Sequence, residues 1–180
     1  GPDFEDGSTE AFLQFFKEQD MKVTFFHIGQ NAETNPSSVL RVIEEGHQIG
    51  NHTMTHGHFN DMDKTGVDWE IENFQNIYIN TFNYTPTVFR SPFLEFNETV
   101  WNKLQELQLP PIDFSVTLED WGDQSASSIK ARLLNQIHPG AILLCHERYK
   151  TLDVLKESIP YLKEMGYKFV TLDELMTYNK

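Results

Sequence analysis

The chain has 180 residues, an apolar content of 39% and a formal net charge of −13. Its length and composition predict one globular domain spanning residues 1–180 with a full hydrophobic core. The acidic balance argues against nucleic acid and anionic membrane surfaces as partners, because both are bound by clustered Lys and Arg.

Hydrophobic periodicity and turn residues predict helices and strands that alternate along the chain. Helices are expected at about residues 9–19, 36–46, 63–81, 99–107, 127–137, 152–165 and 172–178. Strands are expected at about residues 21–28, 48–51, 87–89, 112–116, 141–145 and 167–170. In the longest helix the expected apolar positions are Trp69, Phe74, Ile77 and Tyr78. Alternation of this kind predicts a mainly parallel sheet, either open or closed into a barrel.

Two histidines, His52 and His56, stand four residues apart directly after the expected strand 48–51. This spacing predicts that both rings lie on one face of a helix or of a tight helical turn. Neutral imidazole is the commonest metal ligand, so the pair is a candidate metal site. If the pair is taken alone, the alternative interpretation is that these are two surface histidines on a loop.

Polar residues also follow the other expected strands, where connections between strands and helices gather functional groups. In chain order the clusters are Glu5-Asp6, the histidine pair, Arg90, Glu119-Asp120 and His146-Glu147. Each cluster alone is compatible with a solvated turn or a structural hydrogen bond. Five such clusters at strand ends of one domain predict a shared site.

The residues of these clusters form five ordered motifs. They are Phe4-Glu5-Asp6-Gly7, His52-Thr-Met-Thr-His56, Arg90-Ser-Pro-Phe93, Thr117-Leu-Glu-Asp120-Trp121 and Leu144-Cys-His146. With these motifs the chain resembles carbohydrate esterase family 4, the polysaccharide deacetylase or NodB-homology domain, in a chitin deacetylase-like form. The resemblance runs over nearly the whole chain and implies an α/β fold, a distorted (β/α) barrel of about seven strands. Only three residues precede Phe4, so we leave open whether the first strand is missing.

The resemblance implies one divalent metal ion, held by Asp6, His52 and His56. Two imidazoles and one carboxylate leave open positions for water and substrate, as in catalytic metal sites. Zinc is the leading candidate, and cobalt, manganese, nickel and iron are alternatives.

The resemblance also implies two groups for proton transfer. Glu5 stands at the position of the general base, and Arg90 is expected to pair with it. His146 is the expected general acid, with Asp120 orienting its other ring nitrogen. The expected substrate-binding residues are Trp121, Leu144 and Phe93.

These roles imply a hydrolase that removes N-acetyl groups from N-acetylglucosamine polymers such as chitin or peptidoglycan. The family has Asp where this chain has Glu5, so we expect slow turnover, because about 1 Å of misplacement can cost on the order of 100-fold in rate. Asp3 and Thr117 also depart from the family motifs. The alternatives are a catalytically silent glycan-binding relative and an O-acetyl esterase on another polysaccharide.

The expected location is outside the cell, either secreted or at the cell surface and wall, with a leader absent from this chain. The single cysteine, Cys145, excludes an intrachain disulfide and leaves a cytoplasmic location open. No apolar stretch approaches the ~20 residues of a membrane-spanning helix.

Overall fold

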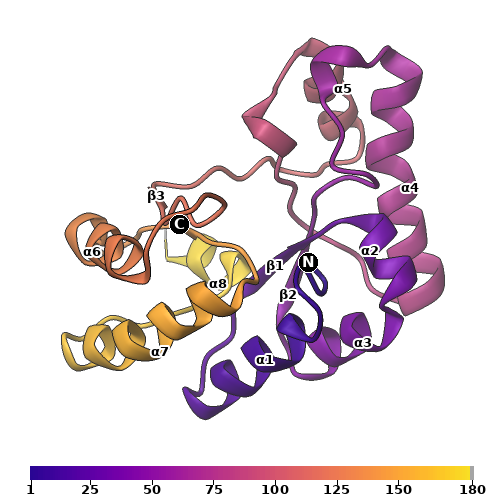
Figure 1. Ribbon diagram of the computed structural model, residues 1–180. Helices are drawn as coiled ribbons and strands as arrows, with labels where there is room; N and C mark the ends of the chain where they lie inside the picture. The colour runs from indigo at the N-terminus through magenta and orange to yellow at the C-terminus, as the bar shows by residue number, and fades with distance from the viewer. Residues whose placement is uncertain (179–180) are drawn as a thin grey trace. The chain divides into compact units, whose positions relative to one another are not determined.

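The computed structural model describes residues 1–178, which divide into two compact units. The first unit consists of Gly1–Pro2 and Thr24–Asp113, and the second of Asp3–Val23 and the chain from Phe114 onward. Figure 1 shows the course of the chain through the elements of each unit. The single domain expected over residues 1–180 stays a prediction.

The first unit is built on two parallel strands, β1 (Thr24–His27) and β2 (Gln48–Asn51). They pair in register from Thr24 opposite Gln48 to His27 opposite Asn51. Parallel bridges from Asn51 to Phe89, and from Phe89 to Pro111, extend this pairing. All four residues of β2 are buried, as expected for a parallel strand covered on both faces. The helices are α2 (Gly29–Thr34), α3 (Pro36–Glu44), α4 (Lys64–Phe82) and α5 (Glu98–Glu106).

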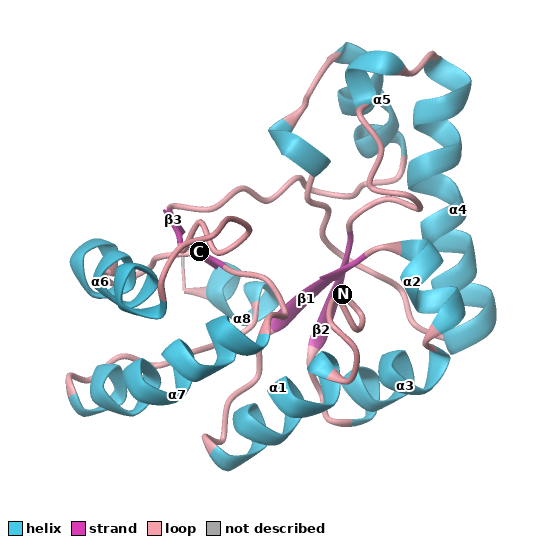
Figure 2. Ribbon diagram, in the orientation of Figure 1, coloured by secondary structure: helices cyan, strands magenta, loops and turns pink. Residues whose placement is uncertain are grey.

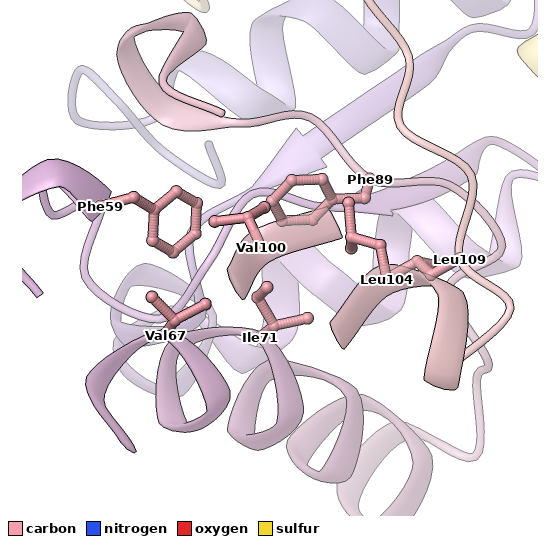
Figure 3. Close-up of a cluster of buried hydrophobic side chains, with 7 residues drawn as sticks. All are labelled: Phe59, Val67, Ile71, Phe89, Val100, Leu104 and Leu109. Atoms are coloured by element: carbon pink, nitrogen blue, oxygen red, sulfur yellow. The ribbon is translucent and has the colours of Figure 1, made fainter. Parts of the chain in front are cut away.

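Helix α4 begins where the side chain of Asp63 accepts a hydrogen bond from the N–H of Gly66, a typical N-cap. Its buried stripe is Val67, Ile71, Phe74, Tyr78 and Phe82, at helical spacing. Figure 3 shows this helix contributing to a buried cluster of Phe59, Val67, Ile71, Phe89, Val100, Leu104 and Leu109. The expectation that Trp69 is a core position is wrong: the residue is 46% exposed, because it lies on the other face of the helix.

The second unit contains the short parallel strands β3 (Val116–Thr117) and β4 (Leu143–Leu144). Its helices are α1 (Ser8–Glu18), α6 (Ala126–Gln136), α7 (Tyr149–Glu164) and α8 (Leu172–Thr177). Helix α7 packs against both α1 and α6. Figure 2 shows that α7 is much longer than the strands β3 and β4. Strand β4 ends just before His146, so it delivers the fifth motif to the start of α7.

All seven expected helices are present, and α2 is an eighth that the sequence pattern did not predict. The expected strand at 167–170 is wrong, since these residues have no strand assignment. The expected strand at 87–89 is reduced to the bridges of Phe89. Among residues 1–178 the strands form two two-stranded sheets and no closed barrel. The α/β character is confirmed, whereas the barrel of about seven strands stays a prediction. None of the described helices has the length and apolar character needed to cross a membrane.

Candidate functional site

His52 and His56 lie in an irregular loop that follows β2, so the expected helical turn is wrong. Thr53 and His56 have positive φ angles of 67° and 59°, which interrupt any helical path. The two rings nevertheless come together, with centroids 4.7 Å apart and planes at 77°. The loop therefore achieves the ring proximity that the spacing predicted, by a different backbone route.

Buried polar groups hold this loop in place. The N–H of Thr53 donates to Oδ1 of Asn51 at 2.9 Å, and the N–H of His56 donates to Oγ1 of Thr53 at 3.0 Å. Glu70 on α4 accepts hydrogen bonds from both the N–H and the hydroxyl of Thr55. Because Asn51, Thr53 and Glu70 are all buried, these bonds are protected from water and restrain the loop.

The hydrogen bond made by His52 defines its tautomer. Its Nδ1 lies 2.7 Å from the carbonyl oxygen of Arg90, and a carbonyl only accepts. Burial lowers the pKa of His52 to about 3, so the ring is neutral at pH 7. Nδ1 therefore carries the proton, and Nε2 carries the lone pair. A metal-binding histidine has this arrangement, in which the other ring nitrogen donates to a backbone carbonyl.

The donor set of the histidine loop therefore fits a divalent metal. Within residues 1–178 no group of three or more His, Cys, Asp and Glu side chains is arranged around a common metal position. Asp6, the expected third ligand, belongs to the second unit, and the two histidines belong to the first. The set of Asp6, His52 and His56 stays a prediction.

Arg90 is buried in the first unit, where it is held by backbone carbonyls. Its Nε donates to the carbonyl oxygen of Ile112 at 3.2 Å, and its guanidinium carbon lies 4.2 Å from the ring centroid of Phe26. These contacts fix the side chain beside the loop of His52. The expected pairing of Arg90 with Glu5 joins the two units and stays a prediction.

Phe93 lies beside the histidine loop and is 53% exposed. Its ring stacks on His58 with centroids 3.8 Å apart and an interplanar angle of 11°, and it meets His56 edge-on at 4.7 Å. Nδ1 of His58 lies 2.8 Å from Oε1 of Glu95. An exposed ring held in this way suits contact with a ligand. Sequence reasoning missed His58 and Glu95, although the spacing of His56-Gly-His58 was a usable signal.

The expected hydrogen bond between Asp120 and His146 is present in the second unit. Oδ1 of Asp120 lies 2.7 Å from Nδ1 of His146, and Oδ2 accepts from the N–H of His146 and from the hydroxyl of Thr151. Burial raises the pKa of Asp120, but these hydrogen bonds outweigh it and hold the pKa below its ordinary value. An ionised Asp120 requires that Nδ1 of His146 donates, which leaves Nε2 as the other ring nitrogen that can bind a proton.

Aromatic rings lie near His146. Trp121 is 5.8 Å from the imidazole between centroids, nearly perpendicular to it, and Phe4 is 6.0 Å away. Trp121 is 53% exposed and Phe4 44% exposed. Leu144, another of the expected substrate-binding residues, is half-buried at the end of β4. Phe4 opens the first motif but was not among the expected substrate-binding residues, and it adds an apolar surface beside the expected general acid.

The two acids of the first motif, Glu5 and Asp6, are held by contacts with Tyr149, the first residue of α7. The carboxylate of Glu5 accepts a hydrogen bond from the N–H of Tyr149 at 2.8 Å. The carbonyl oxygen of Asp6 accepts from the Tyr149 hydroxyl at 2.7 Å, while the Asp6 side chain is exposed. The second unit thus holds the expected base and the expected acid on segments that contact each other.

Comparison with known proteins identifies the family of the chain. The sequence model of a family described as polysaccharide deacetylase matches residues 2–112, more than half of the chain. The chain belongs to the polysaccharide deacetylase family. The resemblance to carbohydrate esterase family 4 is thereby confirmed, and solved structures of that family have the same fold.

Three relatives show how closely other proteins match. The peptidoglycan-N-acetylglucosamine deacetylase PgdA of Listeria monocytogenes is 35% identical over 177 residues, which are 96% of this chain and 37% of that protein. The Bc1960 peptidoglycan N-acetylglucosamine deacetylase structure has a TM-score of 0.91 at 32% identity and covers 97% of this chain and 83% of that one. BA3943 of Bacillus anthracis, titled a CE4 family pseudoenzyme, has a TM-score of 0.88 at 26% identity, covering 93% and 60%. This polysaccharide deacetylase chain therefore spans just over a third of the Listeria protein's length.

Proposed function

We propose that this polysaccharide deacetylase domain is a metal-dependent hydrolase that removes N-acetyl groups from N-acetylglucosamine polymers. The observation that carries the proposal is the neutral His52 ring, oriented by the Arg90 carbonyl and adjacent to His56. The relatives favour peptidoglycan as the polymer, since two of the three are named for that activity. In this proposal the protein acts outside the cell, at the surface or in the wall.

In this proposal His52 and His56 hold a divalent metal, with Asp6 as the third ligand and zinc as the leading candidate. When bound, the metal would polarise the amide carbonyl and lower the pKa of a coordinated water. The protein supplies the remaining chemistry. Arg90 holds His52 in the donor tautomer, and Glu70 holds the loop that carries His56.

Glu5 and His146 are the two groups that move protons. Glu5 takes a proton from the attacking water as the carbon–oxygen bond forms. His146 in its protonated form donates from Nε2 to the departing sugar nitrogen as the carbon–nitrogen bond breaks. Asp120 stabilises the protonated ring through Nδ1 and prevents it from rotating. Phe4, Trp121 and Leu144 supply apolar surface suited to the acetyl methyl group.

A catalytically silent glycan-binding protein is the second candidate. The family neighbour BA3943 is titled a pseudoenzyme, and a mutant of it is titled as having restored enzymatic activity. In this chain Glu5 departs from the family's Asp, and its carboxylate is already bound to the Tyr149 N–H. Metal binding without acetate release would favour this candidate.

The test measures zinc content and acetate release from peptidoglycan and chitin oligomers on one preparation. We expect about one zinc per chain and measurable acetate. His52→Ala should lose both, because it removes one of two imidazole ligands. His138→Ala is the matched control, since His138 is exposed and belongs to the other unit. Full zinc content in His52→Ala would show that this site assignment is wrong.

A further inference from the structure

Four consecutive residues, the last of which begins α7, each contact the N-terminal segment 3–9. His146 lies near Phe4, Glu147 accepts a hydrogen bond from Thr9, Arg148 lies over the ring of Phe4, and Tyr149 bonds to both Glu5 and Asp6. These contacts join positions almost 140 residues or more apart in the sequence. The same short segment therefore carries the expected acid and holds the segment that contains the expected base.

Tyr149 contacts both acids of the first motif, Glu5 and Asp6. Its backbone N–H donates to Oε2 of Glu5 at 2.8 Å, and its hydroxyl donates to the carbonyl oxygen of Asp6 at 2.7 Å. The same hydroxyl lies 3.3 Å from where a Cβ on Gly7 would be, and Gly7 has a φ of 70°. A side chain at residue 7 would be strained and would crowd this hydroxyl. The loop is thus shaped to admit Tyr149.

The far end of the loop is fixed separately. The hydroxyl of Thr9 donates to Oε1 of Glu147 at 2.5 Å, and the backbone N–H of Thr9 donates to Oδ1 of Asp3 at 3.1 Å. Thr9 and Glu147 are buried, so this anchor belongs to the core of the unit. Tyr149 is 45% exposed and adds nothing comparable to the core. Its hydroxyl bond therefore acts on the position of the loop more than on the stability of the unit.

We propose that Tyr149 is a positioning residue, which fixes Glu5 and Asp6 relative to His146. The proposal rests on the proposed function for the roles of those three residues. It also explains the presence of Glu at position 5 in place of the family's Asp. The additional methylene of Glu extends the carboxylate by roughly 1–1.5 Å. The longer side chain accepts a hydrogen bond from the first N–H of α7. This N–H is one of the four amide groups at a helix start that have no intrahelical partner. In this chain the base position and the helix terminus are coupled through Tyr149.

The test compares Tyr149→Phe with Tyr161→Phe. Tyr161 lies on the same helix and is 52% exposed, and within residues 1–178 its hydroxyl has no hydrogen-bond partner. Tyr149→Phe removes only the bond to the Asp6 carbonyl. We expect amide hydrogen exchange in residues 5–9 to rise roughly tenfold without metal or substrate. We also expect zinc affinity to fall by roughly 10- to 100-fold, as for other outer contacts of metal ligands.

In the active protein, kcat should fall by on the order of 10- to 100-fold, with KM changed less than kcat. Tyr161→Phe should match wild type in exchange, zinc affinity and kcat. Unchanged loop exchange and unchanged zinc affinity in Tyr149→Phe would overturn the proposal. If the wild type neither binds zinc nor releases acetate, the proposed function fails. The exchange measurement then decides by itself whether Tyr149 holds the loop.

Discussion

At the scale of residues, the contact that Glu5 makes and the role proposed for it as a base compete for one side chain. Its carboxylate bonds to the N–H at the start of α7, where the partial positive charge of the helix terminus favours an anion. The proposed reaction needs the same carboxylate to accept a proton from water. A shorter Asp would leave the helix terminus without this partner. At position 5 the family's Asp and the Glu of this chain are therefore not equivalent.

The Glu5 variants separate these roles. Glu5→Gln keeps an oxygen for the Tyr149 N–H but removes the base and the charge, so acetate release should fall by on the order of 100-fold and stability by no more than about 0.3–1 kcal/mol. Glu5→Asp loses the helix contact and should cost about 0.3–1 kcal/mol of unfolding free energy. Its rate should change by more than Glu5→Gln lowers it, because the base regains the family's reach. Acetate release at saturating zinc and urea unfolding measure both effects.

Glu33→Gln is the matched control, because Glu33 is exposed on α2 and belongs to the other unit. It should leave rate and stability unchanged. Turnover by the wild type that survives Glu5→Gln would assign proton transfer to another group. A stability equal to wild type in Glu5→Asp would show that the contact with α7 contributes nothing.

The sequence indicated the pair of Asp120 and His146 better than the residues that hold it. Asp120 and His146 could be paired in advance because both belong to recognisable motifs, and the hydrogen bond is present. Thr151, which donates to Asp120, carried no such signal, because a single Thr in a helix is common. Tyr149 was missed because it too lies outside the recognisable motifs. Contacts between distant positions depend on the fold, and one sequence does not display them.

At the scale of elements, α4 is the main support of the histidine loop. Its buried face includes Ile71, and the carboxylate of Glu70 holds Thr55. The helix was predictable because its length and its N-cap at Asp63 agree with its apolar spacing. The exposed Trp69 shows the limit of that reasoning, since a large apolar residue was assigned to the wrong face.

Ile71→Ala should destabilise the first unit by about 2–5 kcal/mol, because Ile71 is fully buried in the cluster of Figure 3. Ile79→Ala on the same helix is the matched control. Ile79 is 44% exposed, and its truncation should change stability by less than about 0.5 kcal/mol. Urea unfolding followed by circular dichroism measures both. Equal losses in the two variants would contradict the packing described for α4.

The strands were less predictable than the helices. β3 and β4 have two residues each, too few for an alternating pattern to specify. Residues 167–170 have the composition of a strand but form none in the described chain. Strand assignment depends on a pairing partner, and composition alone does not supply one. α2 was missed because Gly29-Gln-Asn-Ala-Glu-Thr34 is short and contains poor helix formers.

At the scale of the whole molecule, acid should destabilise the fold well before the carboxylates titrate. His27 is fully buried, and burial lowers its pKa well below the ordinary value. The unfolded chain binds a proton at His27 below about pH 6.5, whereas the folded chain does not. Stability therefore falls as pH drops below that value. Asp120 adds a further loss below about pH 4, since its lowered pKa stabilises the fold only while the carboxylate is ionised.

This reasoning predicts the acid response of a histidine variant. In metal-free buffer, the unfolding free energy of wild type should rise between pH 5 and pH 6.5, and His27→Gln should show a shallower rise. His27→Gln should also be less stable at pH 7, because it loses the contact of Nδ1 with the Tyr78 hydroxyl at 2.6 Å. His138→Gln changes an exposed ring and should keep the wild-type slope. Urea unfolding at half-unit pH steps measures the slope. An identical slope in wild type and His27→Gln would show that His27 is not held neutral by burial.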